Sequence, residues 1–191
     1  KEALMYFQVI YGLSEKIRIS SAFDLDMIRR YEDNIKNIDS LKALGDEALT
    51  DIANYLAKND KEKIFAAISI GGFVESLFLA FELCGDFSED NMIVQRISDQ
   101  KLVLENLINY AQEYQNDQNV AEALEIIRPI RIIYNEMRSS ATDTKVTKDE
   151  SGKLIITGGE KMIITQEQFN LLKTTTRQIR TKITETNENQ I

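Results

Sequence analysis

The sequence predicts a mainly α-helical protein with a small β-hairpin before its last helix. Over residues 1–138, apolar side chains recur at intervals of three and four, the period of amphipathic helices. Beyond residue 138 two short β-branched segments, 144–148 and 153–157, flank a Glu-Ser-Gly turn. We therefore expect one domain, an antiparallel helical bundle or a short array of helical hairpins. Residues 1–138 form its body of about six helices, and residues 139–191 form the hairpin and a C-terminal helix that packs on this body.

The body begins with a helix over residues 2–16, where apolar side chains keep helical spacing. Ser20-Ser21, with Asp24 close behind, is typical of the start of a second helix. This second helix carries Ile28, Tyr31 and Ile35.

A third helix is predicted over residues 39–58 and a fourth over residues 61–84, and we expect the two to pack as an antiparallel hairpin. Asn59-Asp60 provides the break between them. The fourth is the most apolar part of the chain, with Glu75 as its only charge between residues 64 and 81. Its length approaches that of a membrane span, but the central carboxylate and two glycines favour a buried core helix.

Gly71 and Gly72 are interpreted as structural residues of the fourth helix. Gly72, Ser76 and Ala80 recur every four residues and therefore lie on one face, where small side chains let another helix approach closely. The alternative is that the glycines form a hinge or a place where a ligand meets the backbone.

Two further helices complete the body. The pattern predicts one helix over residues 89–114 and another over residues 120–138. Pro129 lies inside the latter and is expected to kink or split it, because proline lacks the N–H that the helix needs.

The last helix begins with a capping box, in which Thr165 is the cap and Gln168 follows three residues later. Ile164 and Phe169 stand where a hydrophobic staple places them. The helix carries one narrow apolar stripe: Phe169, Leu172, Thr176, Ile179 and Ile183.

The composition excludes several functions. The 191 residues include no His and one Cys, which removes His-dependent catalysis, His-ligated metals and a disulfide framework. The net charge of −8 argues against nucleic acid or an anionic membrane surface as a partner. This acidity belongs to the helical body, where 15 Lys and Arg stand against 24 Asp and Glu. Phosphate-binding and nucleophile motifs are absent, so we expect no cofactor, no metal and no assigned catalytic residue.

Three residues are candidates for ligand binding. Glu75 has three interpretations: part of a polar strip with Glu82, a buried carboxylate paired with a cation, or a catalytic acid. Arg128 and Arg131 lie near one helix face and could grip a carboxylate or phosphate, although such a row more often pairs with acidic neighbours.

Several stretches resemble uncharacterised putative lipoproteins of Bacteroidetes-type bacteria. The stretches are ISSAF at 19–23, RYEDNI at 30–35, DSL at 39–41, GGFVE at 71–75, LFLA at 77–80 and ITQEQF at 164–169. The resemblance implies a helical protein without an assigned activity. It also implies an export signal and a lipid-anchoring cysteine upstream of Lys1, since Cys84 lies too far along the chain for that role.

The sequence thus favours a non-enzymatic, lipid-anchored cell-envelope protein that acts through contacts of its helical faces with a protein or a small ligand. The alternative function is a small-molecule-binding or hydrolytic protein that uses Glu75 and the Arg128/Arg131 row. The alternative location is the cytoplasm, which a start codon shortly before Lys1 would indicate. Oligomeric state is beyond the sequence.

Overall fold

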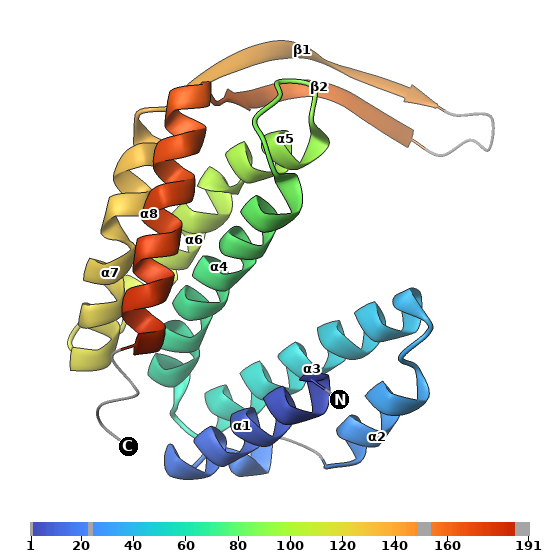
Figure 1. The fold of residues 1–191 in the computed structure, drawn as a ribbon, viewed down its shortest axis with the longest axis vertical. Coiled ribbons are helices and arrows are strands. Elements are labelled where there is room, and N and C mark those ends of the chain that lie inside the picture. The colour runs from blue at the N-terminus through green and yellow to red at the C-terminus, as the bar shows by residue number, and fades with distance from the viewer. Residues whose placement is uncertain (1, 23–24, 149–153, 186–191) are drawn as a thin grey trace. The chain divides into compact units, whose positions relative to one another are not determined.

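The computed structural model describes residues 2–22, 25–148 and 154–185 and is mainly α-helical, with an antiparallel hairpin before the last helix (Figure 1). The predicted fold class is therefore confirmed. The chain divides into two compact units, Lys1–Phe65 (unit 1) and Ala66–Ile191 (unit 2). The division falls inside α4 (Glu62–Cys84), away from residue 138, where the composition changes.

Unit 1 contains α1 (Glu2–Lys16), a 3-10 turn (Ser20–Ala22), α2 (Leu25–Asp33) and α3 (Ile38–Lys58). The first and third match the predicted helices closely. Ser20-Ser21 open the 3-10 turn, and Asp24, their expected capping partner, lies outside the described residues. Ile35 was predicted within the second helix but lies beyond its end, because the chain turns there and Asn37 caps α3 by accepting from the Ser40 N–H at 3.1 Å.

The break between α3 and α4 lies at the predicted place. Asp60 adopts a φ of 55°, a left-handed conformation that ends a helix and is tolerated by aspartate. The other end of α4 is Gly85, whose φ of 69° strongly favours glycine and stops the helix after Cys84. The antiparallel pairing of α3 with α4 stays a prediction.

The helix predicted over residues 89–114 is in fact two helices, α5 (Met92–Ser98) and α6 (Gln100–Gln112). The break follows from buried hydrogen bonds that periodicity does not reveal. The Tyr134 hydroxyl donates to the Ile97 carbonyl at 2.8 Å, and the buried Ser98 hydroxyl donates to the Gln95 carbonyl at 2.8 Å. These side-chain hydroxyls compete with backbone N–H groups for the carbonyls, and such competition interrupts a helix.

The next helix, α7 (Gln118–Asn135), continues through Pro129, so the chain does not split there, and a kink, the other predicted outcome, stays a prediction. Pro129 lies on the exposed side of the helix. The carbonyl that it leaves without a helical donor belongs to Glu125, one turn earlier on the same exposed side. Water can therefore replace the missing N–H, which explains why an interior proline is tolerated here.

The hairpin is longer than predicted. Its strands, β1 (Arg138–Lys148) and β2 (Leu154–Ile163), pair antiparallel from Arg138 opposite Ile163 to Lys148 opposite Leu154. Gly158-Gly159 lies inside β2 instead of closing the hairpin, and the register shifts beside it, where glycine permits a bulge. The predicted turn at residues 150–152 lies outside the described residues.

The final helix, α8 (Gln166–Glu185), confirms its predicted start and its apolar stripe. The Gln168 N–H donates to the Thr165 hydroxyl at 3.2 Å, and the Thr165 N–H donates to Gln168 Oε1 at 3.1 Å. Ile164 and Phe169 are both buried, as a hydrophobic staple requires. The stripe packs into the core of unit 2, which α4, α6 and α7 also line.

Candidate functional site

Helix α4 carries two apolar faces, and only one of them is covered within unit 2. The covered face consists of Ala66, Ile70, Val74, Leu77 and Phe81, all at most 3% exposed. The steps between these residues are four, four, three and four, and this face enters the core together with α6, α7 and α8.

The second face repeats the same steps two residues further along the chain. It consists of Ile68, Gly72, Ser76, Leu79 and Leu83, which we call the open face of α4. Successive helical residues are separated by about 100°, so the open face lies about 200° around the helix from the core face. Ile68 is 43% exposed, Leu79 50% and Leu83 78%, so this apolar stripe faces away from the core of unit 2.

The glycines of α4 do not sit against a close neighbour among the described residues. A Cβ placed at Gly71 or at Gly72 meets nothing within 4 Å. Ala80, on the same face as Gly72, packs against the core of unit 2, and Ser76 and Ala80 line a pocket with residues of α5 and α6. The small residues leave space on the surface of α4, and the structural role predicted for the two glycines stays a prediction.

Among the described residues, α4 is the one helix that is long and apolar enough to cross a membrane by length and composition. Its core face nevertheless belongs to one buried cluster with residues of α5, α6, α7 and α8, and its central carboxylate is paired with α8. Both observations support the interpretation as a core helix with one additional apolar face.

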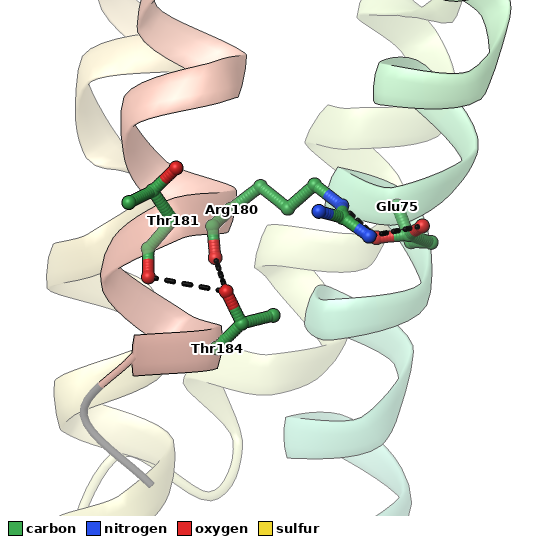
Figure 2. Close-up of polar contacts among 4 residues, drawn as sticks. All are labelled: Glu75, Arg180, Thr181 and Thr184. Carbon is green, nitrogen blue, oxygen red and sulfur yellow. Dashed lines mark hydrogen bonds and ion pairs between the residues drawn. The ribbon is translucent and has the colours of Figure 1, made fainter. Parts of the chain in front are cut away.

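Glu75 lies beside the open face and forms a two-point ion pair with Arg180 of α8 (Figure 2). Arg180 Nε donates to Glu75 Oε2 at 2.7 Å and a terminal nitrogen donates to Oε1 at 3.2 Å. The guanidinium also lies over the Phe78 ring, 4.3 Å from its centroid, a cation–π arrangement. The Thr184 hydroxyl donates to the carbonyls of Arg180 and Thr181 near the end of α8.

Two more cations of α8 form contacts with α4 or with the residue that follows it. Arg177 Nε donates to Glu82 Oε1 at 3.1 Å, and Lys173 donates to the Gly85 carbonyl at 2.9 Å. Glu75 and Glu82 thus lie on a common strip, as their seven-residue spacing predicts, and α8 supplies its counter-charges. The Glu75 side chain is 44% exposed and that of Arg180 37%, so the pair is neither buried nor fully solvated.

The other two sequence candidates lie in separate ion pairs on α7. Arg131 makes a two-point contact with Glu105 of α6, with distances of 3.0 and 2.7 Å, and this hydrogen bonding lowers the pKa of the Glu105 carboxyl. Arg128 pairs with Glu125 of its own helix at 3.1 Å. The structure therefore brings Glu75 together with Arg180 and not with Arg128 or Arg131, and ligand binding by these three residues stays a prediction.

Two features of the structure were not predicted from the sequence. The pairing cations Lys173, Arg177 and Arg180 follow one another at steps of four and three beside the apolar stripe of α8, a signal that was available in the sequence. The open face was also visible in the sequence, because Ile68, Leu79 and Leu83 share one helix face with the small residues Gly72 and Ser76.

A small pocket, which we call the junction pocket, lies where α4 faces the junction of α5 and α6. Its volume is about 220 Å³. Phe73, Leu77, Ala80 and Ile97 supply apolar surface, and Ser76, Arg96 and Gln100 supply polar groups.

Comparison with known proteins gave no match among protein-family models, curated proteins or solved structures.

Proposed function

We propose that this protein is a non-enzymatic, lipid-anchored cell-envelope protein that binds another protein through the open face of α4. The observation that carries the proposal is the duplicated apolar stripe, whose second copy leaves Leu79 half exposed and Leu83 78% exposed. Exposed apolar side chains that share one helix face with small residues on an otherwise charged surface are typical of an interaction site. Steps of three and four suit a partner helix, whose side chains would fill the space at Gly72 and Ser76.

The charges around the open face support a binding role over a catalytic one. The carboxylate with the strongest claim to acid chemistry, Glu75, is held by both guanidinium contacts of Arg180. This ion pair holds α8 on one flank of α4, and within unit 2 the open face beside it is not covered. The envelope location rests on the resemblance to putative lipoproteins.

The binding role is tested by recovering the tagged, full-length protein from its own cells together with bound proteins. The double variant Leu79→Ser/Leu83→Ser removes the apolar contact, and Leu102→Ser is the matched control, because Leu102 is 69% exposed on α6. We expect one protein to accompany the wild type and the control and to fall at least tenfold in the double variant. Equal recovery with all three would contradict the proposal.

The location is tested separately by labelling cells with a fatty-acid analogue and fractionating them. The account predicts a labelled product of the full gene in the membrane fraction. An unlabelled product in the soluble fraction would contradict the envelope assignment and leave the binding proposal standing.

A further inference from the structure

The junction pocket has a wall whose shape is set by buried hydrogen bonds. Ile97, 1% exposed, presents its carbonyl to the Tyr134 hydroxyl, and Ser98, fully buried, contacts the Met162 carbonyl of β2 at 3.3 Å. Gln100, two residues after Ser98, donates to the Arg96 carbonyl at 3.2 Å. The residues of the α5–α6 junction are therefore held in place by the core of unit 2, and the pocket is preformed.

Arg96 is the cation of this pocket and is not neutralised within it. The arginines of α7 and α8, Arg128, Arg131, Arg177 and Arg180, each contact a carboxylate. In the part of the chain that the structure describes, the guanidinium of Arg96 has no such partner, and the pocket lining contains no Asp or Glu. Arg96 differs from the other arginines that contact no carboxylate among the described residues, Arg18 and Arg138, because it lines a pocket.

We propose that the junction pocket binds a small monocarboxylate with a short apolar chain. The planar fork of a guanidinium matches a carboxylate, and one positive charge balances one negative charge. The Ser76 hydroxyl provides a further donor at the same pocket. Phe73, Leu77, Ala80 and Ile97 offer apolar surface to the chain of the ligand.

The size of the pocket limits the ligand. Its 220 Å³ corresponds to roughly seven water molecules at about 30 Å³ each, which suits a ligand of about eight non-hydrogen atoms. A ligand of that size in an open pocket is expected to bind with a Kd on the order of 0.1–1 mM. A phosphate or a larger dianion fits less well, because the pocket offers only one cation.

The test is a titration of the full chain with hexanoate, followed through the methyl signals of Ala80 and Ile97. Hexan-1-ol and hexylamine, which share the apolar chain but lack the carboxylate, are titrated in parallel. We expect saturable shifts of these methyl signals with hexanoate and at least tenfold weaker binding of the other two compounds. Arg96→Gln should weaken hexanoate binding about tenfold or more, since it removes the charged donor.

Two variants complete the design. Arg138→Gln is the control, because Arg138 is also exposed and lies outside the pocket lining, and it should leave hexanoate binding unchanged. Ser76 is an exposed residue of the pocket lining, so the larger side chain of Ser76→Leu should fill the mouth of the junction pocket. This variant should therefore show no saturable methyl shifts with hexanoate. Hexanoate binding that survives Arg96→Gln, or that hexan-1-ol matches, would overturn the proposal. Shifts that grow linearly with concentration across the whole protein would overturn it as well.

Discussion

Buried polar side chains of unit 2 determine where its helices break and meet. The Tyr134 and Ser98 hydroxyls both donate hydrogen bonds to backbone carbonyls, and these hydrogen bonds separate α5 from α6. Thr176 of α8 is different. Its hydroxyl is buried with no hydrogen-bond partner among the described residues, which costs free energy because the group loses its contact with water.

Thr176→Val should therefore stabilise unit 2. Valine has the same shape without the unsatisfied hydroxyl, and the free energy of unfolding should rise by about 1 kcal/mol. Thr174→Val, at an exposed position of the same helix, is the control and should change it little. The measurement is urea unfolding followed through the methyl signal of buried Ile127. A loss of stability in Thr176→Val would show that the hydroxyl has a favourable contact after all.

The buried phenol of Tyr134 should make the stability of the protein depend on pH. Burial raises the pKa of its phenol well above the ordinary value near 10. Above pH 10 the unfolded chain releases this proton while the folded chain keeps it, so stability falls as pH rises, by up to about 1.4 kcal/mol per pH unit. Tyr134→Phe removes this contribution and, near neutral pH, costs about 1 kcal/mol through the lost hydrogen bond to Ile97.

The measurement compares urea unfolding of wild type and Tyr134→Phe at pH 9 and pH 11. The difference between the two proteins isolates Tyr134 from the lysines and the other tyrosines, which titrate in both. Parallel pH profiles would mean that the Tyr134 phenol ionises in the folded state and is not shielded as the structure shows.

At the scale of secondary-structure elements, the contact of α4 with α8 combines an apolar seam with a row of charges. The charged contacts are partly exposed, so each is expected to contribute at most about 1 kcal/mol. The Glu75–Arg180 pair has the most favourable geometry, with two hydrogen bonds and a ring beneath the guanidinium.

A double-mutant cycle measures this pair. For Glu75→Gln and Arg180→Gln, we expect a coupling energy of about 0.5–1 kcal/mol in the free energy of unfolding. The exposed Arg128–Glu125 pair, treated in the same way, is the reference and should give a coupling close to zero. A coupling near zero for Glu75–Arg180 would leave Glu75 available for another role.

The sequence predicted most helices because their apolar periodicity is strong, and the capping box of Thr165 and Gln168 located the start of α8 within one residue. It failed where long-range contacts decide the local structure. The α5–α6 break depends on Tyr134, which is 37 residues away, and the partner of Glu75 is Arg180, 105 residues away. Neither separation leaves a local pattern, whereas the second stripe of α4 was present in the sequence and was overlooked.

At the scale of the whole molecule, the two units differ in how many buried apolar side chains the structure describes in each. The buried apolar residues described in unit 1 are Ile19, Leu44 and Leu56, whereas unit 2 contains a large cluster drawn from α4 to α8 and the ends of the hairpin strands. Stability follows the buried apolar surface, so opening of unit 1 should require less free energy.

Hydrogen exchange tests this difference. We expect backbone amides of α3 around Leu44 and Leu56 to exchange at least tenfold faster than those of α7 around Ile127 and Ile130. All four side chains are at most 7% exposed, so local burial does not by itself explain the result. Equal protection of α3 and α7 would indicate that the two units open together.

The central claim is that the open face of α4 is the surface that binds another protein. It is tested most directly by placing a photo-reactive amino acid at Leu83 of the full-length protein and illuminating living cells, with the same substitution at exposed Leu102 as the control. The account predicts one discrete cross-linked product from position 83, attached to a helical segment of another protein, and none from position 102. No product from position 83, or the same product from both positions, would contradict it.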